Sequence, residues 1–431
     1  MINIIGAGLA GCEAANYLAN KGHKVRLYEM RPKKMTAAHN TDKFGELVCS
    51  NSLKSDSLEN ACGILKEEMN LFNSIILKCA KAHSVPAGGA LAVDREPYSE
   101  MVTKLIKDNP NIEICYDEVT NININEPTII ATGPLTSDDL CLNIKELFGL
   151  EDFYFFDAQA PIIYADSINM DIAYLKSRYD KGEASYLNCP FTKEEFELFY
   201  NELINAEEVE IKDFELKVFE GCMPVEVMAK RGPQTLTFGP MKPVGLRRPD
   251  GTSPYAVVQL RQDDAAKSMY NLVGFQTHLK FGEQKRVFSL IPGLENVRFA
   301  KYGRIHKNTY INAPSILNPT LQTRKYPNLF FAGQLSGVEG YVESAATGLL
   351  AGINMDLYIN NKELVTLPQE SILGSLVHYI SNSNIKDFQP MNANFGILPE
   401  LNFKHHKSDR KRLYGERALS LMKEVKENYG L

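Results

Sequence analysis

The sequence predicts an α/β fold in which a parallel sheet is interrupted by a second, mixed α/β domain. Two stretches far apart in the chain indicate the sheet. Ile2–Ile5 and Leu329–Phe331 are short apolar runs of the kind that form buried parallel strands. Between them the residue composition changes, because an acidic block with a helical pattern is followed by strand-like segments. We therefore expect one discontinuous domain from residues 1–180 and 320–431, and an inserted domain of mixed α/β type from residues 181–319.

A glycine-rich turn follows the first strand directly. Its GxGxxG pattern is formed by Gly6, Ala7, Gly8, Leu9, Ala10 and Gly11. The first glycine permits a tight turn, the second lets backbone approach a pyrophosphate, and the third lets the next helix pack closely. Val25–Tyr28 is a second strand that ends at Glu29, where a carboxylate can accept hydrogen bonds from ribose hydroxyls. These features predict a Rossmann-like dinucleotide-binding unit.

Two later segments favour FAD over NAD as the dinucleotide. Thr128–Gly133 is an apolar strand ending in Ala-Thr-Gly, a sequence that recurs in flavoproteins with two dinucleotide-binding domains. The late apolar strand runs into Gly333-Gln334 and then into a helix that holds Val342–Ala351, so the helix N-terminus is directed at a phosphate or at the flavin ring. We therefore predict a FAD-binding domain of the glutathione-reductase type, with Gly133, Gly333 and Gln334 beside the cofactor.

Composition excludes several classes of protein. The 431 residues leave room for two domains, and 44% hydrophobic with 23% charged residues is ordinary for a soluble globular protein. No apolar run reaches the length of a membrane span, and the first strand begins at Ile2, so we expect a cytoplasmic protein with no membrane partner. The eight cysteines include no CxxC pair, so we expect no metal site.

Charge is distributed unevenly along the chain. The net charge is −6, yet Lys230–Lys325 holds 16 Lys and Arg against 5 Asp and Glu. A basic stretch inside an acidic protein is typical of a polyanion-binding face, although a solvated basic surface has the same composition. His278 and His306 lie in this stretch and are interpreted as contacts to RNA or folate. Lys404–Lys407 and Arg410–Arg412 predict an exposed basic start to the last helix, which is more often a solvated face than a site.

Several local expectations can be checked directly. Ser57 is placed to cap a helix that continues to about Ala82. Thr235–Phe238 and Ala256–Leu260 are expected to be strands of the inserted domain.

Seven long strings spread along the chain carry a family resemblance. They are HNTDKFGELVCSNSLKSD, PAGGALAVDRE, FEGCMPVEVMAKRG, LTFGPMKPVGL, YNLVGFQTHLKFGEQKRVF, FFAGQLSGVEGYVESAATG and QPMNANFGILP. With them the sequence resembles the folate- and FAD-dependent RNA uracil-C5 methyltransferases, which make 5-methyluridine in the T-loop of bacterial tRNA. The resemblance runs from Met1 to about Pro399, and extends more weakly to a larger flavoprotein that modifies wobble uridines.

The resemblance implies a reaction and its partners. FAD would be the cofactor, methylenetetrahydrofolate the source of the one-carbon unit, and NAD(P)H the reductant of the flavin. The substrate would be tRNA, with ribosomal RNA as the alternative. A flavoprotein oxidoreductase acting on a small molecule, or an inactive FAD-bearing RNA-binding protein, remains open on the residues alone.

Five residues within the distinctive strings are candidates for the chemistry. Uracil C5 is a poor nucleophile until a group adds to C6, and a thiolate does this well. Cys49 and Cys222 are the cysteines inside these strings, and the sequence does not decide which of them attacks C6. Glu339, Tyr341 and Glu343 fall where the flavin helix should begin: the tyrosine can stack on a ring and a carboxylate can accept the C5 proton, unless the carboxylates only complement the helix dipole.

Overall fold

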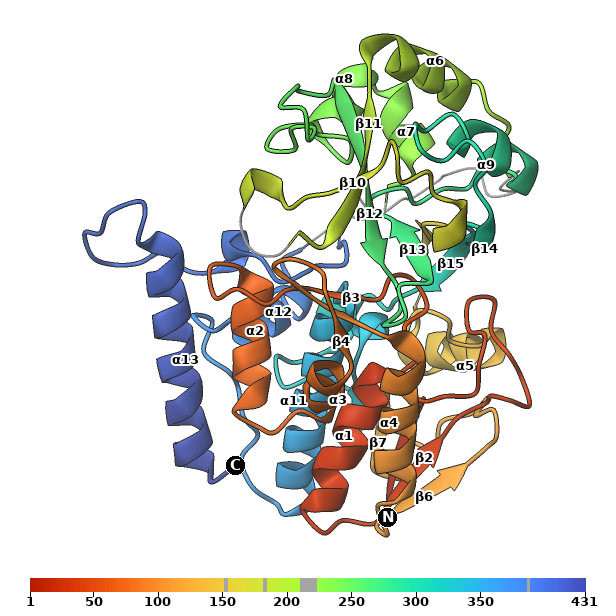
Figure 1. The fold of residues 1–431 in the computed structure, drawn as a ribbon. Coiled ribbons are helices and arrows are strands. Elements are labelled where there is room, and N and C mark those ends of the chain that lie inside the picture. Colours follow the sequence, from red (N-terminus) through yellow and green to blue (C-terminus); the bar gives the residue numbers. More distant parts are fainter. Residues whose placement is uncertain (151–153, 181–183, 210–222, 386–387) are drawn as a thin grey trace.

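A five-stranded parallel sheet forms the centre of the larger part of the molecule (Figure 1). The computed structural model describes residues 1–431 except 151–153, 181–183, 210–222 and 386–387. All neighbouring strands of this sheet run parallel. In spatial order they are β16 (Leu329–Phe331), β7 (Thr128–Ile130), β1 (Ile2–Ile5), β2 (Val25–Tyr28) and β6 (Ile112–Cys115). The two stretches expected to share a sheet therefore do so, which confirms the predicted Rossmann-like class.

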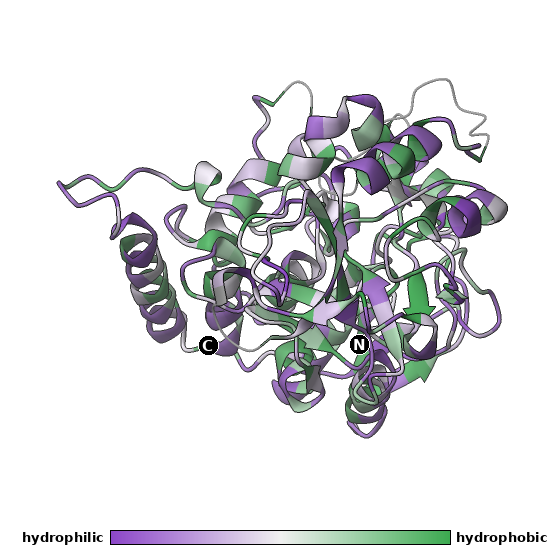
Figure 2. Ribbon diagram, turned by 45° about the horizontal axis from the view of Figure 1, so that its top comes forward, coloured by the Kyte–Doolittle hydropathy of each residue, from purple (hydrophilic) through white to green (hydrophobic). Residues whose placement is uncertain are grey.

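Helices cover this sheet and complete the first hydrophobic core. They are α1 (Leu9–Asn20), α2 (Ala61–Asn70), α3 (Ile75–Ala82), α4 (Arg95–Lys107), α5 (Asp138–Phe148), α10 (Ala313–Ile316), α11 (Tyr341–Ile359), α12 (Ile372–Ile380) and α13 (Arg410–Tyr429). α1 and α11 pack most closely, because Gly348 brings the backbone of α11 against that of Ala10. In Figure 2 the outer helix α13 alternates hydrophilic and hydrophobic residues, as expected for a helix with one buried side.

The helix expected from Ser57 to Ala82 is two helices. α2 begins after Asn60, and the chain turns between α2 and α3 with Asn73 at φ +60°. Ser74 then caps α3 by accepting a hydrogen bond from the Leu77 N–H. The apolar spacing continues through the turn because both helices bury a face in the same core, so periodicity alone does not reveal the break.

A second, antiparallel sheet forms the upper part of the molecule (Figure 1). Its strands are β10 (Tyr174–Leu175), β11 (Tyr186–Phe191), β12 (Ala256–Gln262), β13 (Met269–Leu272), β9 (Ile162–Tyr164) and β14 (Phe299–Lys301). The helices α6 (Lys193–Ile204), α7 (Val225–Lys230), α8 (Pro233–Phe238) and α9 (Phe281–Phe288) belong to this part. Together they enclose a separate hydrophobic core, whose first and last buried residues in the sequence are Ile163 and Val297.

Two sequence expectations for this region differ from the structure. Thr235–Phe238 lies in α8 rather than in a strand, because Pro233 at the first helical turn fixes a helical φ and needs no N–H partner there. β9 and β10 precede residue 181 but pair within the second sheet, so this core begins earlier in the chain than residue 181. The Ala256–Leu260 strand is confirmed as part of β12.

Small elements connect the two parts. A three-stranded sheet is formed by β3 (Ser52–Ser55), β5 (Ala90–Val93) and β4 (Ser84–Val85), and a two-stranded one by β8 (Tyr154–Ala158) and β15 (Ile305–Thr309). Four short 3-10 helices complete the described elements: η1 (Ala165–Ser167), η2 (Arg178–Asp180), η4 (Gln334–Ser336) and η5 (Phe395–Ile397). No helix among the described residues is long and apolar enough to cross a membrane.

Candidate cofactor and active site

The glycine turn after β1 has the geometry that a dinucleotide requires. Gly6 has φ +102°, and a Cβ on it would lie 2.6 Å from the Ala131 carbonyl oxygen. A Cβ on Gly11 would lie 1.8 Å from the Gly6 carbonyl oxygen, so this glycine is needed for α1 to approach the turn. A Cβ on Gly8 would meet nothing within 4 Å, and Gly8 caps α1 without any side-chain hydrogen bond. The N-terminus of α1 therefore faces open space that an anionic group can enter.

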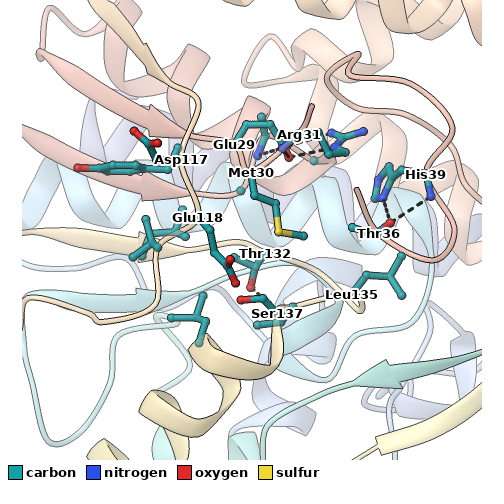
Figure 3. Close-up of a pocket in the computed structure, with 18 residues that line it drawn as sticks. Glu29, Met30, Arg31, Thr36, His39, Asp117, Glu118, Thr132, Leu135 and Ser137 are labelled. Atoms are coloured by element: carbon teal, nitrogen blue, oxygen red, sulfur yellow. Dashed lines mark hydrogen bonds and ion pairs between the residues drawn. The ribbon is translucent and has the colours of Figure 1, made fainter. Parts of the chain in front are cut away.

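A cavity lies over this turn between the ends of β1, β2 and β7 (Figure 3). Figure 3 shows Glu29, Met30 and Arg31 on one side of it and Thr132 and Ser137 on the other. A neighbouring cavity of about 510 Å³ shares five lining residues with it and extends towards Tyr310 and Leu335. The shared residues are Met30, Thr36, Leu135, Thr136 and Ser137. The two together form an elongated space, as a dinucleotide needs.

Glu29 lies at the end of β2, where its sequence position indicated, and it is held in place by Arg31. Its carboxylate accepts hydrogen bonds from the Ala7 N–H at 3.3 Å and from Arg31 through its backbone N–H, Nε and Nη2 at 2.9 to 3.0 Å. Burial pushes the pKa of Glu29 upward, but the hydrogen bonds and charge of Arg31 outweigh it and keep the pKa below its usual value. The carboxylate is therefore ionised, as an acceptor for ribose hydroxyls should be.

Arg31 is a site residue that the sequence reasoning missed. It is 1% exposed and also contacts the Glu46 carboxylate at 3.2 Å and the Thr41 carbonyl oxygen at 3.1 Å. It thus connects the end of β2 to the loop that leads towards Cys49. The only feature of the sequence that could have indicated this role is the position of Arg31, two residues after Glu29 at the end of β2.

The late glycine turn lies against the first one. Gly333 has φ +74°, its N–H donates to the Thr347 hydroxyl at 2.9 Å, and a Cβ on it would lie 3.1 Å from the Ala10 Cβ. Gly133 has φ +69° with open space beside it, and Gln334 Nε2 donates to Glu339 Oε2 at 2.6 Å. An uncapped helix N-terminus, an ionised carboxylate and two glycines beside open space fit FAD in this groove.

The loop that carries Cys49 is held from several directions. The Cys49 N–H donates to the Tyr341 hydroxyl at 2.7 Å, and Arg95 Nη2 donates to the Cys49 carbonyl oxygen at 3.2 Å. The preceding carbonyl oxygen, of Val48, accepts from Gln159 Nε2 at 2.8 Å and from Lys301 Nζ at 3.4 Å. Arg95 and Tyr341 are the first residues of α4 and α11, which cover the parallel sheet, whereas Gln159 and Lys301 lead into and out of the second sheet. The thiol therefore lies at the junction of the two parts.

Positive charge collects around this loop. Arg95, Arg261 and Lys301 all interact electrostatically with Cys49, while Asp263 pairs with Arg95 at 3.0 Å. Burial lowers the pKa values of Arg261 and Lys301. Asp263 and Glu46 offset part of this charge, since Glu46 acts on Lys301. Nearby cations are the surrounding that a reactive cysteine requires. None of the three cations was singled out from the sequence as a partner of Cys49.

Glu343 and Glu339 point into the protein. Glu343 is completely buried and accepts hydrogen bonds from Lys54 Nζ at 2.7 Å and from the Ala393 N–H at 3.0 Å. Its second oxygen has no hydrogen-bond partner among the described residues. Glu339 is also buried and bonds Gln334. Tyr341 is the member of the predicted trio whose polar atom contacts the Cys49 loop.

Cys222 lies outside the described residues. The chain that follows it is anchored, because the Val225 N–H donates to the Gln276 carbonyl oxygen at 2.8 Å. His278 is 3% exposed and lies between the carboxylates of Glu208 at 2.8 Å and Glu226 at 3.0 Å. The expectation that His278 contacts RNA or folate from the surface is therefore wrong: the ring is enclosed by two carboxylates, and burial raises the pKa of Glu226. The side chain of His306 is not described.

The basic stretch Lys230–Lys325 contributes less unpaired positive charge to the surface than its sequence suggests. Several of its cations are neutralised by acidic residues, most of which come from elsewhere in the chain. These ion pairs are Lys230–Glu208, Lys280–Glu207, Arg286–Glu202, Arg286–Glu283 and Arg298–Asp166. Arg247, Lys285 and Arg304 are exposed and have no ion pair within the described parts of the chain. No group of three or more His, Cys, Asp or Glu side chains among the described residues could hold a metal ion.

The fold and the paired glycine turns define the class: a flavoprotein built on a Rossmann-type FAD-binding domain. The family model described as glucose inhibited division protein A matches residues 1–363. Crystal structures of GidA from Aquifex aeolicus superpose on all of this chain and on up to 76% of theirs, with a TM-score of 0.72 at 18% identity.

Relatives of known name are much closer in sequence. The chain is 60% identical over 427 residues to the methylenetetrahydrofolate–tRNA-(uracil-5-)-methyltransferase TrmFO of Bacillus velezensis, covering 98% of each chain. It is 59% identical over 429 residues to the protein of the same name from Listeria monocytogenes, covering 99% of each. The chain belongs to the GidA family and, within it, to the TrmFO proteins.

Proposed function

We propose that this chain is a methylenetetrahydrofolate-dependent tRNA (uracil-5-)-methyltransferase that uses FAD and is reduced by NAD(P)H in the cytoplasm. One observation carries the proposal. The helix that follows the late glycine turn and the Cys49 loop meet through the 2.7 Å hydrogen bond between Tyr341 and Cys49. This contact supports Cys49 as the candidate nucleophile at the junction of the two domains, in a chain about 60% identical to proteins named for this reaction.

The role we assign to the thiols follows from the chemistry of uracil. A thiolate sulfur forms a bond to C6, and the electron pair of the C5–C6 double bond moves towards C5 and the O4 carbonyl. C5 then forms a bond to the methylene carbon of the folate as one C–N bond of that carbon breaks and its electron pair stays on the nitrogen. C5 loses its proton, a C–H bond replaces the second C–N bond so that the amine leaves, and the thiolate is expelled as the C5–C6 double bond reforms. Reduced FAD, when bound, supplies electrons that bring the one-carbon unit to the level of a methyl group. Cys49 and Cys222 are our candidates for attack at C6 and for removal of the C5 proton.

The remaining residues position the reacting groups. Arg95, Arg261 and Lys301 stabilise a thiolate at Cys49 by their charge. Glu343 is enclosed and paired with Lys54, so we assign it to holding the start of α11 rather than to proton transfer. Tyr341 holds the Cys49 backbone. Gly6–Gly11, Glu29, Gly133, Gly333 and Gln334 are proposed to hold FAD.

RNA is proposed to bind on the second domain, which we place at residues 181–319 together with β9 and β10. The exposed cations without ion pairs, such as Arg247, support this role. Arg286 is a poorer candidate, because Glu202 and Glu283 already neutralise it. Arg247→Ala should weaken RNA binding more than Arg286→Ala does.

The test is the appearance of 5-methyluridine in RNA. The FAD-bound protein is incubated with methylenetetrahydrofolate, NADPH and either unmodified tRNA or ribosomal RNA, and the nucleosides are then analysed. We expect 5-methyluridine in tRNA only. Product in ribosomal RNA alone would replace the substrate, and a FAD-bearing protein that reduces its flavin but modifies neither RNA would overturn the proposal.

A covalent trap tests the thiols. Fluorine at C5 cannot leave as a cation, so RNA containing 5-fluorouridine should remain attached to the attacking cysteine on a denaturing gel. Cys49→Ala and Cys222→Ala should each abolish methylation, and the one that removes the adduct identifies the residue that attacks C6. Cys115→Ala, a half-buried thiol on β6, is the control and should keep both methylation and adduct. Full methylation by both Cys49→Ala and Cys222→Ala would refute the thiolate mechanism.

A further inference from the structure

The chain forms an exposed basic arm between η5 and α13. We define the C-terminal arm as residues 401–412, which comprise a loop and the first residues of α13. Residues 402–408 are all exposed, and Phe403 is 55% exposed. Figures 1 and 2 both show the arm projecting away from the body of the molecule, and in Figure 2 much of it has the hydrophilic colour.

The arm is attached to the body at both ends. At its beginning, Arg417 donates to the carbonyl oxygens of Pro399 at 2.8 Å and Glu400 at 3.1 Å. At its end, Tyr414 is 1% exposed and stacks on Phe395 with 5.7 Å between ring centroids. The projection is therefore a loop with fixed ends rather than a free tail.

Positive charge dominates the arm. It contains five Lys and Arg residues and one carboxylate, Asp409. Arg412 contacts the carboxylates of Asp409 and Glu416, and Arg410 bonds the Tyr414 hydroxyl. The other cations are Lys404, Lys407 and Lys411, which are exposed and have no ion pair within the described parts of the chain.

Folding alone does not explain this charge. Three consecutive cations, Arg410 to Arg412, begin α13, whose first turn contains no acidic residue and whose Asp409 cap makes no side-chain hydrogen bond. Positive side chains at a helix N-terminus oppose the helix dipole and cost stability. The dipole and the side chains instead add to one positive potential, which is the arrangement that an anionic partner stabilises.

An aromatic ring accompanies these cations. Phe403 makes an edge contact with His405 at 5.9 Å between ring centroids, and its ring remains more than half exposed. Unpaired RNA bases stack on exposed aromatic rings while cations contact the phosphates. A membrane surface would require several apolar side chains, but Phe403 is the one large hydrophobic residue exposed in the arm, all of which is described.

We propose that the C-terminal arm is a second RNA contact, separate from the reaction site, which binds phosphates of the substrate RNA through its lysines and stacks Phe403 on an unpaired base. This inference rests on the proposed function only in taking RNA as the substrate. In this inference the arm binds RNA outside the reacting uridine and so contributes to affinity. The reaction itself takes place at the junction that holds Cys49.

The test compares two triple variants of equal charge. The arm variant is Lys404→Ala, Lys407→Ala and Lys411→Ala. The control is Lys78→Ala, Lys362→Ala and Lys423→Ala, which removes three exposed lysines elsewhere. Binding of unmodified tRNA is measured by fluorescence anisotropy across a salt series, with FAD content and flavin reduction by NADPH as checks of the fold.

We expect the arm variant to raise Kd about tenfold and to reduce the slope of log K against log salt by about 2 to 3. The control should change both Kd and the slope by less than half as much as the arm variant does. Methylation should show a higher KM with kcat unchanged. Phe403→Ala should raise Kd with the salt slope unchanged. Equal effects in both triple variants, or a change in oligomeric state without loss of RNA affinity, would overturn the inference. RNA binding is measured in the absence of the methylation reaction. A failure of this inference is therefore distinguishable from a failure of the proposed reaction.

Discussion

At the scale of single residues, the hydroxyl of Tyr341 is the contact that joins the flavin helix to the candidate nucleophile. Removing it in Tyr341→Phe leaves the Cys49 N–H without its 2.7 Å acceptor and frees the loop. We expect kcat for methylation to fall roughly tenfold to a hundredfold, because small misplacement of a reacting group has effects of this size. FAD content should remain unchanged.

Tyr358→Phe is the matched control, because it removes a hydroxyl from the same helix away from the Cys49 loop. It should leave kcat within a factor of two of the unmodified protein. Equal loss of activity in Tyr341→Phe and Tyr358→Phe would show that the hydroxyl of Tyr341 has no special role.

Glu68 is a buried carboxylate with a predictable effect of pH on stability. It accepts hydrogen bonds from the N–H groups of Ile372 at 2.7 Å and Leu373 at 2.9 Å, and so caps α12 from another helix. Burial raises the pKa of Glu68 from its ordinary value of 4.5 to about 7, against the pull of those two N–H groups. Between these values the folded protein keeps a proton that the unfolded chain releases, so the free energy of unfolding falls as the pH rises from about 4.5 to 7.

The Glu68→Gln variant lacks this titration. The stability of the unmodified protein relative to Glu68→Gln should therefore be greater at pH 5 than at pH 8, by on the order of 1 to 3 kcal/mol. Urea unfolding at several pH values measures this difference. Glu67→Gln, at the neighbouring and more exposed carboxylate, should keep the pH profile of the unmodified protein. Parallel profiles for Glu68→Gln and the unmodified protein would contradict the assignment.

At the scale of elements, we expect the proposed FAD groove to depend on how closely α1 and α11 approach. A Cβ on Gly348 would lie 2.2 Å from the Ala10 carbonyl oxygen, a backbone atom that cannot move aside, whereas a Cβ on Gly352 would lie 3.1 Å from the Ala14 Cα. Gly348→Ala should therefore separate the helices, cost roughly 1 to 3 kcal/mol and reduce bound FAD. Gly352→Ala should cost less, because its nearest contact, at 3.1 Å, needs only a small shift. The helix propensity of alanine, about 1 kcal/mol better than that of glycine, applies to both variants and can outweigh only this smaller strain. The measurements are thermal unfolding and the flavin absorbance of purified protein, and equal loss in both variants would contradict the graded packing.

At the scale of the whole molecule, Asn51 joins the two cores. It is completely buried and donates to the carbonyl oxygens of Val93, Gln262 and Asp263, while its own oxygen accepts from Arg261 Nε at 3.0 Å. Asn51→Ala leaves these buried groups without partners, so we expect a loss of several kcal/mol and a looser junction. Unfolding by urea should then separate into two transitions, and methylation should fall further than stability alone explains.

Asn188 provides a matched control within one core. It is equally buried, donates three hydrogen bonds at 3.0 to 3.1 Å and accepts one from Gln259, all inside the second sheet. Asn188→Ala should destabilise the protein to a similar degree. If it separates the two transitions as Asn51→Ala does, the junction is not the cause.

The sequence by itself determined the features that neighbouring residues encode. GxGxxG between an apolar run and a helix, Glu29 at the end of the next strand, and the glycines after β7 and β16 were all recognisable, because strand length, turn conformation and helix packing impose their demands on consecutive residues. The fold class followed from them, and so did the prediction of where FAD binds. The long strings of the family resemblance likewise pointed to Cys49 and Tyr341 before their contact was known.

Only the tertiary structure decided which distant groups meet. Arg95 is 46 residues away in sequence from Cys49, whose carbonyl oxygen it binds, and Lys301 is 253 residues away from Val48. In the same way Glu208 contacts His278, and Glu202 neutralises Arg286. The strength and sign of such effects depend on distance and on exclusion of water, and both are set by packing between elements rather than by order along the chain. For that reason the sequence could predict where FAD binds, while the electrostatic surroundings of Cys49 and the extent of the basic surface required the folded molecule.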